Sequence, residues 1–251
     1  MSQTASPYQF LLPPQTPARG NVTAYVTEAL RNAIVSLEFA PGTMLDKGAI
    51  CERLGVSRFP VSEALARLQA EGLVDILPQR GTTVSLVRIA DVLEYMVIRK
   101  ALESEAVRIV VGNPPAGLVA ALQENMALQR LAAEADDGDG FHRVDLAFHH
   151  LILDAQRFIK IRGVIESARA NLDRARRLIM NPRRLTVTIA EHQAILDGII
   201  ASDPGAAAAA LRHHIDTVMV ELIAFARRHP DLFADGQQML DTPGYDSFPF
   251  G

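Results

Sequence analysis

Hydrophobic residues recur at helical spacing near the start of the chain, at Val26, Ala29, Leu30, Ala33, Ile34 and Leu37. Steps of three and four residues predict one buried helical face, and the helix is expected to end at Pro41-Gly42. Two shorter helices should follow. Asp46 is predicted to cap the first and Gly55 to end it; Ser57 is predicted to cap the second, whose first turn tolerates Pro60. This arrangement is typical of a helix-turn-helix.

A β-hairpin is predicted directly after these helices. The runs 73–77 and 82–86 are rich in β-prone residues and flank Pro78-Gln79-Arg80-Gly81. A hairpin in this position is a wing, so residues 21–88 are expected to form a winged helix-turn-helix of three helices and a hairpin. In such a domain the third helix enters the major groove of DNA and the wing reaches an adjacent groove or the backbone.

The remainder of the chain up to about residue 229 is expected to be entirely helical. Turn-forming residues punctuate it near residues 112–115, 136–140, 181–182 and 203–205. They separate predicted helices at 90–111, 115–135, 141–155, 158–180, 186–202 and 204–228. The fold class is therefore mainly α, with a second domain over 89–229 that is a bundle of six or seven helices. The alanine run 206–210 is interpreted as a closely packed helix.

The two ends of the chain lack these patterns. Residues 1–20 are expected to be a disordered leader. They lack the positively charged start and the following apolar run of a secretory signal. Residues 230–251 are rich in Pro, Gly and Asp and are expected to form an irregular tail.

Composition changes this picture little. The formal net charge is −4; residues 1–88 contribute +1 and the rest −5, so bulk charge alone does not indicate DNA binding. The only cysteine, Cys51, excludes an intramolecular disulfide and is expected to be a small buried residue. No stretch approaches the ~20 apolar residues of a membrane-spanning helix, so a cytoplasmic protein with no membrane partner is expected.

The DNA-binding prediction rests on a specific motif. Three stretches carry this motif: Leu54-Gly-Val-Ser-Arg-Phe-Pro-Val-Ser-Glu-Ala-Leu65, Glu71-Gly-Leu-Val74 and Arg80-Gly81. With them, the chain resembles the GntR-type winged-helix repressors over about residues 22–87. In that family the positions of Arg58, Arg80 and Gly81 contact double-stranded DNA. The resemblance implies the same role here, with Arg58 at a phosphate or base edge and the wing near the minor groove.

Three positions depart from the usual family pattern. Ser62 stands where most members have a second arginine, Phe59 where many have a small residue, and Gly48 where a basic residue is usual. Ser62 can still donate a hydrogen bond, and Lys47 can substitute for the missing basic residue. The operator is expected to differ from the family's usual one, because a bidentate arginine contact to guanine is not available at Ser62.

All seven histidines fall in the second domain. Asp145 and His149 share one helix face, and His192 and His214 lie on later helices. Together they could hold Zn, Ni, Mn or Fe with open positions for a ligand, although an Asp-x-x-x-His pair alone is more typical of a helix surface. The chain resembles the FCD effector domain of the FadR-type GntR subfamily at three places: Asp145-x-x-x-His149, Glu191-His192 and His214. The resemblance implies that Asp145, His149, His192 and His214 ligate a divalent metal, with Zn or Ni favoured, whereas His150 and His213 have no such role.

The same resemblance points to an effector pocket. Arg99 matches a family position that faces the effector cavity, and Asn171 and Arg174 are expected to line it. A guanidinium beside a metal with open coordination positions suits a small organic acid or sugar acid. The alternative for Arg99 is a surface ion pair with Glu103, one turn along the helix.

These features predict a transcription regulator, and not an enzyme. By resemblance it is a homodimeric repressor on a pseudo-palindromic operator, controlled by a carboxylate bound at the metal. A first alternative is a repressor for which the metal itself is the signal. A remote alternative is a metal-dependent hydrolase, for which Glu191 is the only obvious general base.

Overall fold

The computed structural model describes residues 8–14, 22–167 and 169–241. The chain divides into two compact units, the first made of residues up to 87 together with 232–234, and the second of the remainder. The predicted mainly helical fold class is confirmed.

The first unit is a helix-turn-helix with a small sheet. Its elements are α1 (Val22–Val35), β1 (Met44–Leu45), α2 (Lys47–Leu54), α3 (Arg58–Ala70), β2 (Val74–Leu77) and β3 (Gly81–Val84). Apolar faces of the three helices form the core, including Val26, Leu30, Ile34, Ile50, Leu54, Val61, Leu65 and Leu68. Of the positions predicted for the first helix, Val26, Leu30 and Ile34 are buried as the helical spacing predicts, whereas Ala29 and Leu37 are only partly buried.

Two of the four predicted helix ends are found as expected. The prediction that the first helix ends at Pro41-Gly42 is wrong, because α1 already ends at Val35. The Asp46 side chain accepts hydrogen bonds from the backbone N–H of Gly48 (2.7 Å) and Ala49 (3.1 Å), which caps α2. Gly55 follows α2 with a φ of 65°, a conformation that favours glycine. Ser57 stands at the start of α3 but makes no side-chain cap hydrogen bond, so that expected contact is absent.

The sheet has one more strand than the sequence predicted. β2 and β3 form the expected antiparallel hairpin, with Val74 opposite Val84 and Leu77 opposite Gly81. The two residues of β1 pair on the other side of β3, which gives the strand order β1-β3-β2. Two residues are too few to show the alternation that marks a strand in a sequence.

Part of the expected disordered leader is packed in the structure, which corrects that prediction for residues 8–14. The rings of Tyr8 and Phe10 lie 5.0 and 4.9 Å from the ring of Phe39, and Leu11 is buried. Arg53 of α2 donates hydrogen bonds to the carbonyl oxygens of Tyr8 and Gln9. The leader residues 1–7 and 15–20 lie outside the described residues.

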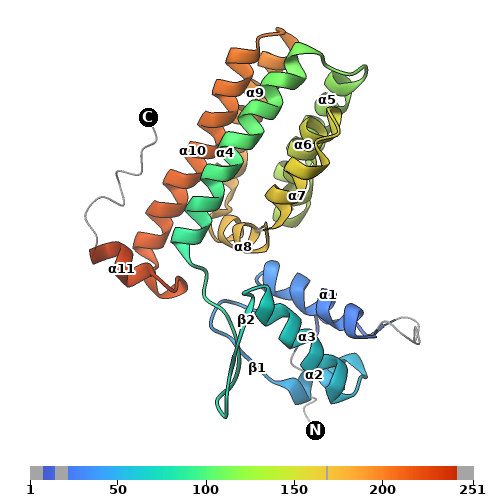
Figure 1. Ribbon diagram of the computed structural model, residues 1–251, viewed down its shortest axis with the longest axis vertical. Helices are drawn as coiled ribbons and strands as arrows, with labels where there is room; N and C mark the ends of the chain where they lie inside the picture. The colour runs from blue at the N-terminus through green and yellow to red at the C-terminus, as the bar shows by residue number, and fades with distance from the viewer. Residues whose placement is uncertain (1–7, 15–21, 168, 242–251) are drawn as a thin grey trace. The chain divides into compact units, whose positions relative to one another are not determined.

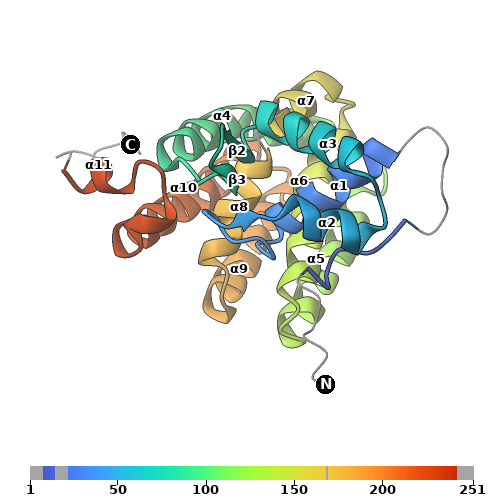
Figure 2. The ribbon, with the colours of Figure 1, turned by 90° about the horizontal axis from the view of Figure 1, so that it is seen from below.

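The second unit contains the expected helical bundle. Its helices are α4 (Ile89–Gly112), α5 (Leu118–Glu134), α6 (Gly138–Ala155), α7 (Ile159–Ser167), α8 (Arg169–Ile179), α9 (Pro182–Ile200) and α10 (Pro204–Arg228). Helices α4 and α10 run side by side, as do α5 and α6 (Figure 1). The segment predicted as one helix over 158–180 is two helices, and α8 packs against α4 and α10 (Figure 2).

The alanine run is closely packed in part: Ala207 and Ala208 are buried, whereas Ala206 and Ala209 are exposed. A Cβ placed on Gly198 of α9 would come 2.6 Å from the backbone nitrogen of Ala207 in α10. Only small residues allow the two helix backbones to approach this closely, and this contact keeps α9 and α10 in fixed register.

The described part of the tail is ordered, contrary to the expected irregular chain. It forms the 3-10 helix η1 (Pro230–Leu232) and α11 (Gly236–Asp241). Between them, the Asp235 carboxylate accepts hydrogen bonds from the backbone N–H of Ile89 (2.8 Å) and Ala90 (3.0 Å), so it caps α4. Residues 242–251 of the expected tail lie outside the described residues.

Candidate functional site

The residues predicted to bind DNA lie mostly on exposed surface of the first unit. Arg58, Phe59 and Ser62 are exposed in the first two turns of α3, and the Phe59 side chain is 73% exposed. Arg80 and Gly81 are exposed where the hairpin turns, and Lys47 is half-buried at the first residue of α2. An exposed phenylalanine beside an exposed arginine is available to contact a partner.

The four predicted metal ligands come together in the second unit. Asp145 and His149 project from one face of α6, His192 comes from α9, and His214 from α10. One ligand atom from each residue lies within 4.8 Å of the other three. The four residues are 1%, 4%, 0% and 1% exposed, respectively. The sequence placed these residue types on three helices, and the bundle brings them to one point.

Neighbouring residues fix the outer nitrogen of each imidazole. Nδ1 of His149 lies 2.8 Å from Oε2 of Glu103 in α4, and Nδ1 of His192 lies 2.9 Å from Oε1 of Gln129 in α5. Nδ1 of His214 lies 2.8 Å from Oε2 of Glu191. Nδ1 of His149 is close to Glu103 but makes no hydrogen bond of regular geometry. Ionised carboxylates and amide oxygens accept hydrogen bonds, so the contacts at His192 and His214 favour the tautomer that keeps its proton on Nδ1. The lone pair is then on Nε2.

The electrostatic surroundings favour neutral side chains at His192 and His214 and a charged carboxylate at Asp145. Burial, reinforced by neighbouring histidines, lowers the pKa of His192 and of His214 well below the ordinary value. Burial alone would raise the pKa of Asp145, but the charge of Arg176 and the nearby imidazoles hold it well below its usual range. Neutral imidazoles and an ionised carboxylate are the forms that bind a metal.

Unsatisfied polar atoms support a metal centre at this point. Nε2 of His149 and Nε2 of His192 are buried and have no hydrogen-bond partner among the described residues. The His192 ring also stacks on the ring of Phe148, with centroids 4.2 Å apart, which restrains its orientation. Buried nitrogens that lack a partner are costly unless something binds them. The side chains present therefore fit a transition metal.

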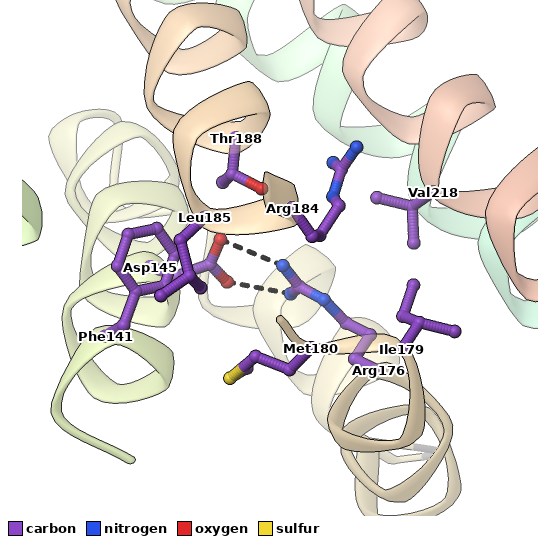
Figure 3. Close-up of a pocket in the computed structure, with 9 residues that line it drawn as sticks. All are labelled: Phe141, Asp145, Arg176, Ile179, Met180, Arg184, Leu185, Thr188 and Val218. Atoms are coloured by element: carbon purple, nitrogen blue, oxygen red, sulfur yellow. Dashed lines mark hydrogen bonds and ion pairs between the residues drawn. The ribbon is translucent and has the colours of Figure 1, made fainter. Parts of the chain in front are cut away.

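A small cavity lies beside Asp145, between α6, α8, α9 and α10. Its lining includes Arg176, Met180, Arg184 and Thr188 (Figure 3). The volume is about 20 Å³, which is room for about one water molecule. Nη2 of Arg176 donates a hydrogen bond of 2.9 Å to Oδ1 of Asp145, and its Nη1 lies 2.8 Å from Oδ2.

The predicted effector residues do not line this cavity. Arg99 forms a buried pair with Glu103, with distances of 2.6 Å from Nε to Oε1 and 3.2 Å from Nη2 to Oε2. The alternative prediction of an Arg99–Glu103 pair is thus met, but in the interior instead of on the surface. Arg174 is fully buried and donates to Oδ1 of Asn171, which is half-buried.

Sequence reasoning missed several residues around the centre, among them Glu103, Gln129, Arg176 and Arg184. Two of them carried a usable signal. Arg176 lies four residues after the buried Leu172 and three before the buried Ile179, on the apolar face of α8. Arg184 precedes Glu191 by two helical turns. The positions of Glu103 and Gln129 depend on how separate helices pack, which spacing within one helix does not reveal.

The remaining candidates take other positions. The Glu191 carboxylate contacts Nδ1 of His214 and also accepts a 2.7 Å hydrogen bond from Nη2 of Arg184. Oε2 is therefore committed to two positively polarised groups, which suits positioning of His214 better than general-base chemistry. His213 is exposed, and His150 is half-buried with its Nε2 3.5 Å from Oε1 of Glu166.

Comparison with known proteins agrees with this architecture. Residues 23–84 match the bacterial regulatory proteins of the gntR family, and residues 94–217 match the FCD domain. An HTH-type transcriptional regulator from Streptomyces ambofaciens is 31% identical over 82% of this chain and 86% of that protein. The transcriptional repressor RspR of Escherichia coli is 28% identical over 85% of this chain and 94% of that protein.

Solved structures show the same fold. Escherichia coli McbR/YncC aligns with a TM-score of 0.66 at 24% identity, over 81% of this chain and 97% of that one. A GntR regulator from Rhodococcus aligns with a TM-score of 0.69 at 24% identity, over 80% and 97%. None of the described helices is long and apolar enough to cross a membrane.

The fold and these matches define a DNA-binding transcriptional regulator with a winged helix-turn-helix and a helical effector domain. The chain belongs to the GntR family and carries an FCD domain.

The buried pair behind His149 yields a prediction about stability. Replacement of Glu103 by Gln leaves Arg99 buried without a charged partner, and we expect this to lower the free energy of unfolding by about 3 to 5 kcal/mol. Urea denaturation measures the change. Glu105 lies on the same helix and pairs with Arg108 on the surface, so Glu105→Gln is the control and should leave stability nearly unchanged. Equal effects of the two substitutions would contradict the importance of the buried pair.

Proposed function

We propose that the protein is a transcriptional repressor whose operator binding is controlled by a small carboxylate held at a metal centre. The observation that carries the proposal is the buried cluster of Asp145, His149, His192 and His214, whose ligand atoms lie within 4.8 Å of one another. Repression is supported by the function named for the related RspR. Because its target is chromosomal DNA, the protein would act in the bacterial cytoplasm.

The ligand set favours a divalent transition metal. Three imidazoles and one carboxylate suit Zn or Ni, and Mn and Fe accept the same donors. Asp145, His149, His192 and His214 would hold the ion, which would supply a Lewis acid for an oxygen ligand. The surrounding residues hold the imidazoles in the required orientation, through Glu103, Gln129 and Glu191.

Charge balance favours an anionic effector. Each of the three carboxylates around the centre is already paired with one arginine: Glu103 with Arg99, Asp145 with Arg176, and Glu191 with Arg184. Imidazoles bind a metal in their neutral form, so the charge of a divalent ion would be left uncompensated in a buried environment. An uncompensated buried charge is costly. A small organic acid or sugar acid would reduce this cost, and Arg99, Asn171 and Arg174 remain proposed effector contacts around it.

A metal-responsive repressor is the second candidate. It is favoured by the cavity volume of about 20 Å³, which has no room for an organic acid without a movement of side chains. In that case the metal alone would change DNA affinity, whereas a carboxylate sensor would change it only when the acid is added to metal-loaded protein. Titration of each compound at constant DNA concentration separates the two.

Control of DNA binding requires a difference in affinity. We propose that the protein binds a pseudo-palindromic operator as a homodimer, with α3 of each protomer in the major groove and the wing at the minor groove or backbone. An effector can release the operator only if it binds the free form more tightly than the DNA-bound form.

For the DNA interface we expect Arg58→Ala to weaken operator binding about tenfold to a hundredfold, because it removes a phosphate or base contact at the start of α3. Fluorescence anisotropy with operator DNA at several salt concentrations measures the loss and the change in salt dependence. Arg67→Ala is the matched control, since Arg67 is equally exposed but lies in the last turn of the same helix. Unchanged affinity and salt dependence in Arg58→Ala would remove Arg58 from the interface.

For the metal centre we compare two adjacent histidines of α10. His214→Ala removes a buried ligand and should abolish stoichiometric metal binding, while His213→Ala alters an exposed side chain and should leave metal content unchanged. Elemental analysis of the purified variants after dialysis gives the metal content per chain. His192→Ala should behave like His214→Ala. Full occupancy in either ligand variant would exclude that residue from the site.

A further inference from the structure

Arg176 places a second cation at the carboxylate of a metal ligand. The side chain extends from α8 toward Asp145, and both guanidinium Nη atoms lie within 2.9 Å of carboxylate oxygens (Figure 3). Both residues are buried, with Arg176 8% and Asp145 1% exposed. The pair therefore contributes the positive charge that a buried carboxylate requires.

A metal ion would make this guanidinium redundant. Once Asp145 and the three imidazoles bind one ion, the ion is a second source of positive charge beside the carboxylate, and the carboxylate donates electron density to it. Its interaction with Arg176 then weakens, because the two cations compete for one carboxylate and repel each other. Arg184 cannot take over as the cation that moves, because its Nη2 is bound to Glu191 and its Nη1 lies 3.5 Å from Glu221.

We propose that Arg176 exchanges partners. The guanidinium neutralises Asp145 while the metal is absent, and it turns to the carboxylate of the effector once the metal has taken Asp145. This inference rests on the metal-dependent function proposed above and adds a residue and an order of events to it. Metal binding comes first, because it releases the arginine that then receives the acid.

The cavity gives a second, independent reason for this exchange. The side chain of Arg176 forms part of its wall, and the volume of about 20 Å³ holds about one water molecule. A carboxylic acid enters only if a wall residue moves. Movement of the Arg176 guanidinium both enlarges the cavity and leaves a bidentate donor at its edge, which matches the geometry of a carboxylate.

Arg99 is less suited to this role, although it is also a buried arginine near the centre. Its partner Glu103 already holds Nδ1 of His149 and would lose its full cationic partner if Arg99 moved away. Among the described residues, no other arginine or lysine is paired with Glu103. Arg99 therefore keeps its pair with Glu103 when the metal binds.

The test compares Arg176→Gln with Arg177→Gln, its neighbour on α8, which pairs with the exposed Asp139. Zinc affinity is measured at pH 8 by competition with a chromophoric chelator. Acid binding is measured as the shift in melting temperature of zinc-loaded protein with acetate, lactate, malate or gluconate. We expect Arg176→Gln to bind zinc about 5- to 100-fold more tightly than the wild type, because the competing cation is gone. It should also lose the shift caused by acids, while Arg177→Gln matches the wild type in both measurements.

Arg176→Lys is a control for misfolding of Arg176→Gln, because it keeps the positive charge and removes only the bidentate donor. It should bind zinc like the wild type and show a reduced acid shift.

The exchange is overturned if Arg176→Gln binds zinc no more tightly than the wild type does, or if it keeps the shift in melting temperature caused by acids. If the wild type binds no zinc, the proposed metal centre fails together with this inference. If it binds zinc but responds to none of the acids, the proposed binding of a carboxylate effector fails, both in the proposed function and in this inference. If the wild type binds both and Arg176→Gln behaves like Arg177→Gln, this inference alone fails.

Discussion

One buried negative charge organises the effector domain. Asp145 lies in the interior of a helical bundle, where a carboxylate is stable only with a cation beside it. The structure meets this requirement with Arg176 and surrounds the carboxylate with three imidazoles from α6, α9 and α10. Since a metal ion meets the same requirement, Asp145 can be neutralised either by Arg176 or by a metal ion. That property makes it suitable for a switch.

The ligand geometry depends on contacts that reach across the bundle. Glu103 of α4, Gln129 of α5 and Glu191 of α9 each contact the outer nitrogen of one imidazole. Gln129 is itself held by a 2.7 Å hydrogen bond from its amide nitrogen to Asn125. The centre is thereby in direct contact with the four helices α4, α5, α9 and α10. The close contact of Gly198 with Ala207 keeps α9 and α10 from yielding independently.

The sequence predicts most of the architecture because the relevant signals are local. Helical spacing, the Asp46 cap and the Gly55 turn specify the helix-turn-helix, and spacing places Asp145 and His149 on one face of a helix. The convergence of His192 and His214 on that face was predicted from family resemblance, because periodicity along a helix does not specify which helices become neighbours.

The features that sequence reasoning missed are contacts between distant segments. Asp235 caps α4 from 146 residues away, and residues 8–14 pack against Phe39 and Arg53. Arg176 likewise pairs with Asp145 across 31 residues. A charged residue in such a pair looks like an ordinary surface residue in a sequence, because its partner is specified only by tertiary packing.

Metal-dependent binding of a carboxylate is the central claim, and a thermal-shift screen of the wild-type protein tests it most directly. Melting temperatures are measured against a panel of organic and sugar acids, with zinc present and again after chelation. Since a ligand that binds only the folded state raises its stability, we predict that at least one acid raises the melting temperature with zinc and loses this effect on chelation. An acid that stabilises both forms equally, or a protein stabilised by zinc but by none of the acids, would contradict the account.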